Sequence, residues 1–361
     1  IADLYDKYLQ NPDIVEPSWR SFFQGYDLAN ENFSFTDDSE VSEEIPQSVR
    51  KEFLVVDLIN GYRTRGHLFT KTNPVRDRRK YTPTLDIENF GLSKSDLDST
   101  FNAGEIVGIG PKKLSEIIVH LERTYCDSIG VEYMYMRNPE KLIWWKDRLI
   151  ENDNHPNYTQ DAKKYILSKL NQAVTFESFL QTKYVGQKRF SLEGGEALIP
   201  GISVALRNAA EVYGVEECVL GMAHRGRLNT LVNIFKKPVR DLFSEFEGKD
   251  FEDTNIDGDV KYHLGLTLSK TFRNGKQIKM NLVPNPSHLE TVAAVAEGIA
   301  RAKIDRKYNG DESKILPIIV HGDAAIAGQG IAYEVTQMAK LNGYKTGGTI
   351  HIVVNNQIGF T

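Results

Sequence analysis

The sequence holds a Gly-Asp pair that is followed, after a helical stretch, by an Asn-Asn pair. Asp323 stands directly after an apolar run, and Asn356 follows the next run 33 residues later. This separation fits one strand end, a helix and the next strand end. A carboxylate and an amide supply the hard oxygen ligands that suit Mg²⁺, which keeps water and phosphate oxygens in its octahedral shell. The pattern therefore predicts a site for Mg²⁺ and a diphosphate.

Small residues surround this aspartate. Gly322 allows a tight turn, and Ala324 and Ala325 let main-chain N–H groups at a helix start approach an anion. The carbonyl of Ile358 lies close enough in sequence to be a third protein ligand. The alternative is structural: Asp323 caps a helix and the asparagine pair forms a turn. The complete order of strand, Gly-Asp-Ala, helix, strand and Asn-Asn favours the ligand site.

Other polar residues follow apolar runs in the same way. Four loops carry them, at His224-Arg225, Ser287-His288, Asp323 and Asn355-Asn356. Ligands of open α/β sheets bind at the carboxyl ends of the strands, so we expect the four loops to share one rim. The sequence thus predicts one polar pocket and leaves its chemistry open.

The elements that must position these loops are strands and helices in alternation. Apolar runs predict four strands, at residues 218–221, 278–283, 315–320 and 349–354. At least three of these runs are followed by a loop and then a helical stretch. This repeated order is typical of a mostly parallel sheet, so the fold class is predicted as α/β.

The first half of the chain has a different pattern. Residues 1–24 combine a short amphipathic helix, a turn and an aromatic patch, which suggests a docking arm, with a disordered tail as the alternative. Residues 25–49 are acidic and contain no Lys or Arg, as in a solvated linker. Apolar residues at helical spacing predict a helical domain at 50–183. The α/β domain is then expected at 184–361.

The composition is that of an ordinary globular protein. Its 361 residues suggest two domains or slightly more, and the net charge of −5 gives no basic footprint for nucleic acid. No apolar run approaches the ~18 residues of a membrane helix, so no membrane association is expected. The two cysteines, Cys126 and Cys218, lack metal-ligand spacing and fit a reducing compartment. The chain opens at Ile1 and stops at Thr361 soon after a strand, so we expect a piece of a longer polypeptide.

The Gly-Asp-x and Asn-Asn pairs resemble the thiamine diphosphate-binding motif, although Ala324 replaces the glycine common at the third position. Neighbouring segments narrow the resemblance: Lys188-Arg-Phe-Ser-Leu-Glu-Gly-Gly-Glu196, Gly221-Met-Ala-His-Arg-Gly-Arg-Leu-Asn229, Asp259-Val-Lys-Tyr-His-Leu-Gly265, Asn285-Pro-Ser-His-Leu-Glu290 and Val354-Asn-Asn-Gln-Ile-Gly-Phe360. Together they are similar to the decarboxylating first component of 2-oxoglutarate dehydrogenase complexes. The similarity covers essentially the whole chain, including the arm.

The resemblance implies roles for individual residues. It implies Mg²⁺ ligands at Asp323, the Asn356 side chain and the Ile358 carbonyl. It implies contacts to thiamine diphosphate from Arg225, Ser287, Leu289, Ala324 and Ala325. His224 and His263 are similar to the catalytic pair that binds the distal carboxylate of the substrate, with Ser287 beside them. Histidine suits that task because it titrates near neutrality.

Some of these residues also have purely structural interpretations. Ser287 and Glu290 have the spacing of a capping box at a helix start. Leu289 alone is typical of a core residue. His321, which precedes Gly322, is expected to do no more than position Asp323, and His351 is expected in the core because it lies in the middle of a strand.

The Lys188–Glu196 segment is rich in glycine and charge. We expect it to form an ordered turn held by salt bridges, and we assign it no catalytic role.

The resemblance implies oxidative decarboxylation of 2-oxoglutarate and transfer of the succinyl group to the lipoyl group of a dihydrolipoyl succinyltransferase. It also implies a homodimer, located in the bacterial cytoplasm or the mitochondrial matrix. The glutamate that activates the cofactor in this family would lie beyond Thr361, so the 361-residue chain is expected to bind cofactor weakly and not to turn over.

Three other functions remain open. They are a same-fold enzyme for 2-oxoadipate, a non-oxidative decarboxylase or carboligase, and a non-catalytic interaction fragment. One extra methylene in the acid is worth only about 1–3 kcal/mol of discrimination, so the sequence does not separate the two acids.

Overall fold

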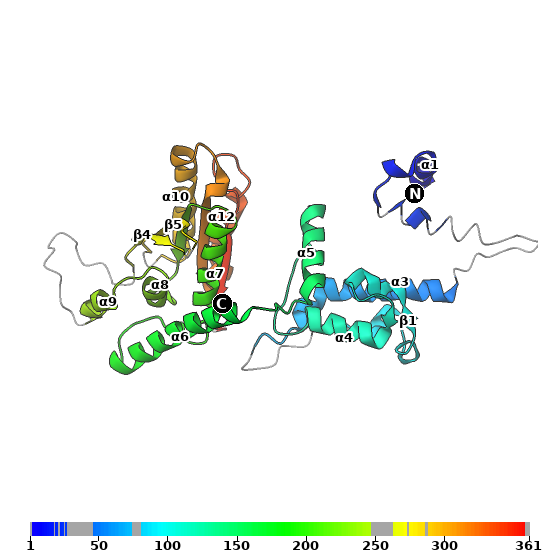
Figure 1. Ribbon diagram of the computed structural model, residues 1–361, viewed down its shortest axis with the longest axis horizontal. Helices are drawn as coiled ribbons and strands as arrows, with labels where there is room; N and C mark the ends of the chain where they lie inside the picture. The colour runs from blue at the N-terminus through cyan, green and yellow to red at the C-terminus, as the bar shows by residue number, and fades with distance from the viewer. Residues whose placement is uncertain are drawn as a thin grey trace, which may run out of the picture. The chain divides into compact units, whose positions relative to one another are not determined.

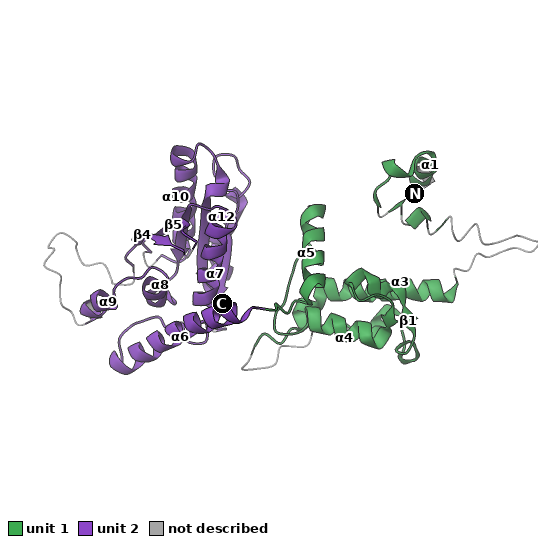
Figure 2. Cartoon of the chain, in the orientation of Figure 1, with its two compact units in different colours: residues 1–157 green, residues 158–361 purple. Residues whose placement is uncertain are grey.

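The computed structural model describes residues 2–17, 19–20, 22–24, 26, 46–73, 81–246, 263–272, 274–285 and 288–357. The chain divides into two units, residues 1–157 and residues 158–361 (Figure 2). Most of the expected acidic linker lies outside the described residues. Among the described residues, no helix is both long and apolar enough to cross a bilayer.

The N-terminal segment folds around aromatic side chains. Helix α1 (Ala2–Gln10) is followed by a single 3₁₀ turn at Pro12–Ile14. The buried members of the cluster are Tyr8, Val15 and Phe23. The expected helix, turn and aromatic patch are therefore confirmed.

The other described residues of the first unit form three helices and several short 3₁₀ turns. The helices are α3 (Gln47–Arg65), α4 (Leu114–Tyr125) and α5 (Pro139–Asn152). Strands β1 (Thr100–Phe101) and β2 (Lys112–Lys113) form a small antiparallel pair. The apolar stripe of α3 is buried as its spacing predicts, at Val55, Leu58, Ile59 and Tyr62.

The boundary between the units lies between Asn157 and Tyr158, whereas we expected it at 183/184. The difference concerns α6 (Gln160–Lys183). The buried side chains of this helix, Ala173, Phe176 and Leu180, belong to the core of the second unit. The helical spacing in α6 predicts a buried face. It does not indicate whether that face packs in the core of the first or of the second unit.

The second unit is built on a five-stranded sheet of order β4-β5-β3-β6-β7 (Figure 1, yellow-green to red). The strands are β3 (Glu217–Met222), β4 (Leu266–Thr271), β5 (Gln277–Leu282), β6 (Ile315–Gly322) and β7 (Ile350–Val354). The four strands predicted from apolar runs are confirmed, and they are parallel to one another. The mostly parallel α/β fold is therefore confirmed.

Helices cover both faces of this sheet. One face packs against α6, α7 (Leu198–Glu211), α8 (Arg227–Asn233) and α9 (Val239–Phe246). The other face packs against α10 (Thr291–Lys307) and α12 (Gly330–Met338). Along β3 the side chains alternate, so Cys218 and Leu220 point to the first core and Val219 to the second.

A glycine in β3 lets α10 approach the sheet closely. A Cβ atom on Gly221 would lie 3.1 Å from the Ala296 Cβ atom and 3.1 Å from the Val292 carbonyl oxygen. This close packing fixes the start of α10 over the carboxyl end of β3, where the candidate site lies.

The edge strand β4 was not among the predicted strands. It pairs with β5 in antiparallel orientation, through a turn in which Gly275 has a φ of +82°. Its exposed and half-buried residues alternate, so it lacks the continuous apolar run that marks the other strands. The Asn274-Gly275 pair after an alternating Leu-x-Leu segment is a hairpin signal that identifies it in retrospect.

Candidate functional site

The structure places the loops of interest on one rim of the sheet. The parallel strands end at Met222, Leu282, Gly322 and Val354. The residues that follow these ends within three positions are His224, Asn285, Asp323 and Asn355. Ser287 and Ile358, which we assigned to the same rim, lie outside the described residues.

His263 reaches the same rim by another route. It precedes Leu266, the first residue of β4, and β4 runs antiparallel to the other strands. The start of β4 therefore lies beside the carboxyl end of β5. The main-chain N–H of Asn285, just after β5, donates to the His263 carbonyl oxygen at 3.0 Å. His263 is buried, at 8% exposure.

Two groups of side chains occupy neighbouring parts of this rim. His224 follows the carboxyl end of β3, and His263 lies before the start of β4, beside the end of β5. Asp323 and the asparagine pair follow the carboxyl ends of β6 and β7. Strands β3 and β6 are direct neighbours, and neighbouring strands lie about 4.8 Å apart. One elongated ligand can therefore reach both groups.

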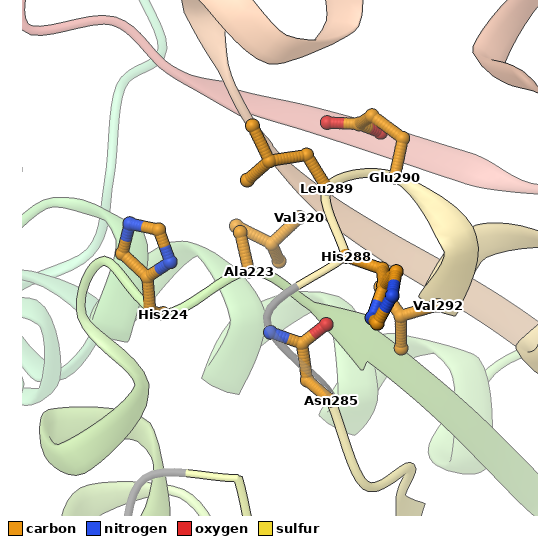
Figure 3. A pocket seen from close by; sticks show the side chains of 8 residues that line it. All are labelled: Ala223, His224, Asn285, His288, Leu289, Glu290, Val292 and Val320. Atoms are coloured by element: carbon orange, nitrogen blue, oxygen red, sulfur yellow. The ribbon is translucent and has the colours of Figure 1, made fainter. Parts of the chain in front are cut away.

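His224 lines a small cavity together with residues that follow β5 and residues at the start of α10. Figure 3 shows His224 on one side of it and Asn285 and His288 on another, with Leu289 above. The cavity itself is about 10 Å³, enough for about one water molecule. It marks where the side chains converge rather than the volume of a ligand. Leu289 is 44% exposed, so its interpretation as a core residue is wrong.

His224 lies in a positively charged environment. Burial lowers the pKa of its imidazole, and the nearby Arg225, Lys188 and His263 lower it further. The neutral form is therefore favoured in the free protein, and an anion bound here would reverse the preference. A cluster of this kind is suited to a carboxylate ligand.

The Lys188–Glu196 segment reaches the site, although we assigned it no role there. The Phe190 and His224 rings have centroids 3.9 Å apart, and the Lys188 Nζ atom lies 5.0 Å from the centroid of the Phe190 ring. Phe190 has a φ of +44°, an uncommon conformation for a non-glycine residue and one that is enriched at functional sites. A cation and an aromatic residue inside a glycine-flanked loop are the sequence signal that could have drawn attention to this segment.

Main-chain contacts hold this segment in place. The Gly226 N–H donates to the Phe190 carbonyl oxygen at 3.0 Å, and the Arg225 Nη1 atom donates to the Ser191 carbonyl oxygen at 3.0 Å. The expected salt bridges are also present, from Arg189 to the buried Glu177 and to Glu193. The ordered turn is therefore confirmed, and it delivers Phe190 to His224.

Gly226 makes this contact possible. Its φ is +74°, and a Cβ atom on it would lie 2.7 Å from the Leu192 Cδ1 atom. It is also the N-cap of α8, which carries no side-chain cap. Glycine at this position therefore avoids both the strain of a positive φ and a close contact with the Leu192 side chain.

Glu290, which lines the same cavity as His224, begins a hydrogen-bonded chain through two histidines. His321 is buried, with its Nδ1 atom 2.5 Å from the Glu290 Oε2 atom and its Nε2 atom 2.9 Å from the His351 Nδ1 atom. Glu290 occupies the N-cap of α10 with a φ of +68° rather than the third helical position, so it does not complete the expected capping box. His351 is exposed and hydrogen-bonded, so its prediction as a core residue is wrong: β7 is an edge strand of the described sheet.

Asp323 lies where a metal ligand was expected. Gly322 of β6 pairs with Val354 of β7, so Asp323 and Asn355 follow directly from paired residues on adjacent strands. Asp323 is the first residue of α11 (Asp323–Gly328), and Gly322 is its N-cap, so the interpretation of Asp323 as a cap is wrong. Within the described part of the chain, its half-buried carboxylate makes no hydrogen bond or ion pair.

Asn355 and Asn356 have different surroundings. The Asn355 Oδ1 atom accepts from the Gln357 N–H at 2.8 Å, which is the side-chain turn that we considered as the alternative. Asn356 is exposed. An aspartate and an asparagine from adjacent strand ends form a hard oxygen set that fits Mg²⁺. The described residues contain no group of three or more His, Cys, Asp or Glu arranged to hold a metal.

The first turn of α11 supplies small residues at this position. Ala324 and Ala325 are half-buried, and a Cβ atom on Gly322 would meet no atom within 4 Å. Space is therefore open above the helix start, where main-chain N–H groups face the rim without a side-chain cap. This arrangement fits the phosphate end of a ligand.

Two family models match parts of the chain. The family model described as the dehydrogenase E1 component matches residues 168–361, which include all the site residues above. A second model, described as the 2-oxoglutarate dehydrogenase N-terminus, matches residues 1–30.

Individual relatives carry related names. The 2-oxoglutarate dehydrogenase E1 components of Azotobacter vinelandii and Cupriavidus necator are 40% and 41% identical to the whole chain, which covers 40% of each. The 2-oxoglutarate dehydrogenase E1/E2 component of Corynebacterium glutamicum is 49% identical over 89% of the chain and 27% of its own length. The chain thus spans about 40% of the length of the first two relatives.

Proposed function

The chain belongs to the dehydrogenase E1 component family, and from this we propose that its rim takes part in the oxidative decarboxylation of 2-oxoglutarate with thiamine diphosphate and Mg²⁺. The family is thiamine diphosphate-dependent. The substrate, the metal and the residue roles are our proposal.

One observation carries this proposal. A cationic pocket built on His224 and an oxygen-ligand group built on Asp323 stand on neighbouring strand ends of one sheet. A 2-oxo dicarboxylate has two different ends: a 2-oxo acid, which reacts, and a distal carboxylate, which is bound by positive charge. We place the distal carboxylate against His224 and His263, so that the reacting 2-oxo acid faces the part of the rim where the cofactor would be held.

The first group of residues binds and orients the acid. His224 takes up a proton when a carboxylate arrives, and the imidazolium then forms a charge-assisted hydrogen bond. Lys188, which is exposed, and Arg225, which is half-buried, add positive electrostatic potential at the imidazole. Phe190 covers one face of the imidazole and excludes water from it.

The second group holds the cofactor. Mg²⁺ would be held by Asp323, the Asn356 side chain and the Ile358 carbonyl, and thiamine diphosphate would be contacted by Arg225, Ser287, Leu289, Ala324 and Ala325. When bound, thiamine diphosphate supplies a nucleophilic carbon and an electron sink, which together permit loss of CO₂ from a 2-oxo acid. The protein contributes the placement of the two ligands relative to each other.

The proposal extends to partners. The succinyl group would pass to the lipoyl group of a dihydrolipoyl succinyltransferase. The E1/E2 name of the Corynebacterium glutamicum relative and the match of residues 1–30 to the N-terminal model support this. A homodimeric assembly in the bacterial cytoplasm or the mitochondrial matrix completes the proposal.

Calorimetric titration of the 361-residue chain tests the cofactor half. Thiamine diphosphate is expected to bind only when Mg²⁺ is present, and Asp323→Ala is expected to abolish that binding. Asp311→Ala is the matched control, because it removes an exposed carboxylate that caps a 3₁₀ turn. Binding that needs neither Mg²⁺ nor Asp323 would contradict the proposal.

A pair of acids tests the substrate half. 2-Oxoglutarate is expected to bind more tightly than 2-oxovalerate, which has the same chain length and lacks the distal carboxylate. His224→Ala is expected to remove the difference. Equal binding of the two acids by the unchanged protein would exclude the assignment of His224 to the distal carboxylate.

A further inference from the structure

Arg227 is the largest fully buried side chain among the described residues, with 0% exposure. It is the first residue of α8 and has no assigned part in the site. Burial lowers the pKa of its guanidinium to about 10. A buried charge is costly unless its environment compensates it, so the acceptors around Arg227 need explanation.

The acceptors of Arg227 are main-chain carbonyl oxygens from three separate segments. The Nη1 atom donates to Met222 O at 3.1 Å. The Nη2 atom donates to Leu264 O at 2.8 Å and to Val283 O at 2.7 Å. A planar guanidinium holds several donors in a fixed geometry, so one side chain fixes three segments at once.

Each of these carbonyls lies within two residues of His224, His263 or Asn285 in the sequence. Met222 ends β3, two residues before His224, and Leu264 adjoins His263. Val283 follows β5, two residues before Asn285. The Asn285 N–H in turn donates to the His263 carbonyl oxygen, which closes the connection between the last two segments.

We propose that Arg227 is a positioning residue that sets the separation of His224 and His263 by tying together the ends of β3 and β5 and the segment before β4. This inference rests on the proposed function, because its binding test assumes that the two histidines hold a dicarboxylate. The β6 and β7 ends, which carry Asp323 and Asn356, make no contact with the Arg227 guanidinium through these hydrogen bonds. Arg227 therefore acts on one half of the rim.

The test uses Arg227→Lys in the 361-residue chain. Lysine keeps the charge but offers one nitrogen in place of two on a shorter side chain, so it cannot reproduce the bonds to Met222, Leu264 and Val283 in one fixed geometry. Glutarate, which has two carboxylates and no reactive keto group, is expected to bind roughly ten- to hundredfold more weakly. The affinity for thiamine diphosphate with Mg²⁺ is expected to stay within about twofold.

Arg63→Lys is the matched control. Arg63 is also buried and donates through Nη2 to a carbonyl oxygen, that of Ile106, but it belongs to the first unit. This variant is expected to leave both affinities unchanged. Equal losses of glutarate binding and cofactor binding in Arg227→Lys would show a general structural role and would overturn the proposal.

Histidine resonances separate this inference from the proposed function. In ¹⁵N-histidine-labelled protein, the His224 and His263 signals are expected to shift in Arg227→Lys and not in Arg63→Lys. If the unchanged protein binds no glutarate, the dicarboxylate role fails, while these shifts still support positioning by Arg227. Unshifted signals would overturn it.

Arg227→Gln provides a second variant if Arg227→Lys does not fold. Glutamine keeps an N–H₂ donor for the carbonyls without the charge, and the same two measurements apply. Failure of both variants to fold would assign Arg227 to the stability of the fold and would overturn a role specific to the site.

Discussion

The ring of His224 lies against the ring of Phe190, with centroids 3.9 Å apart, although the two residues come from separate segments of the chain. The contact depends on two hydrogen bonds, from Gly226 to the Phe190 carbonyl and from Arg225 to the Ser191 carbonyl. The His-Arg-Gly segment thus presents the imidazole and also positions the aromatic ring that covers it. This coupling gives the site its first testable property.

Phe190→Leu is expected to raise the pKa of His224 toward the ordinary histidine value. Burial is the largest cause of the lowered pKa, and the smaller side chain admits water to one face of the imidazole. An NMR titration of His224 measures the change. Phe179→Leu, which disrupts a stacked pair with Phe243, is the control and should leave His224 unaffected. An unchanged His224 titration in Phe190→Leu would contradict this account of the site.

The affinity for 2-oxoglutarate is expected to fall as the pH rises from 6 to 8. The pKa of His224 is lowered, so the free protein holds it neutral at pH 7, whereas a bound carboxylate favours the imidazolium. Binding then takes up a proton, and the affinity decreases by up to about tenfold per pH unit. Calorimetry in two buffers of different protonation enthalpy counts the proton directly. In His224→Gln the pH dependence should flatten; a slope that persists there would assign the proton to another group.

The two asparagines are expected to differ in their effect on the metal. Asn355 uses its side chain in a turn, so Asn355→Ala costs about 0.5–1.5 kcal/mol of stability and changes the Mg²⁺-dependent affinity for thiamine diphosphate by only a few fold. Asn356→Ala removes an oxygen ligand and should weaken that affinity about tenfold or more. Titrations of both variants under one set of conditions make the comparison. The reverse order of effects would exchange the two roles.

Gly226→Ala is expected to lower the unfolding free energy of the second unit by more than the strain of a positive φ alone. Both Gly226 and Gly214 have positive φ, at +74° and +67°, but only a Cβ atom on Gly226 meets a neighbour, the Leu192 Cδ1 atom at 2.7 Å. Gly214→Ala should therefore cost about 1–2 kcal/mol of unfolding free energy, and Gly226→Ala should add about 1–3 kcal/mol for overpacking. Urea denaturation of the two variants measures the difference, and equal costs would show that the Leu192 side chain moves away freely.

The parallel strands of the second unit were predictable because each coincides with a continuous apolar run in the sequence. Residues 218–221, 278–283, 315–320 and 349–354 all lie within or overlap observed strands. The rim followed from strand direction alone, which is why the positions of His224 and Asp323 could be predicted. The edge strand β4 lacked that signal, and its antiparallel direction is what brings His263 to the rim. The residues alone gave no positional argument for His263.

Long-range side-chain contacts were beyond the reach of local patterns. Glu290 and His321 are 31 residues apart in sequence, and their hydrogen bond replaces the local capping box that the Ser-x-x-Glu spacing suggested. The exposure of His351 depends on whether a strand lies beyond β7, which the apolar run at 349–354 does not reveal. The contact of Phe190 with His224 likewise depends on how a loop folds back, and local spacing describes only the loop itself.

The most direct test of the account measures whether the metal and the distal carboxylate occupy neighbouring parts of one rim. Mn²⁺ prefers the same oxygen ligands as Mg²⁺ and is paramagnetic, so it broadens nearby resonances when it replaces Mg²⁺ with thiamine diphosphate. Strand spacing places His224 roughly 5–15 Å from the metal. We expect strong broadening of the His224 signal and of bound 2-oxoglutarate, both abolished by Asp323→Ala. Bound Mn²⁺ that leaves both signals sharp would contradict it.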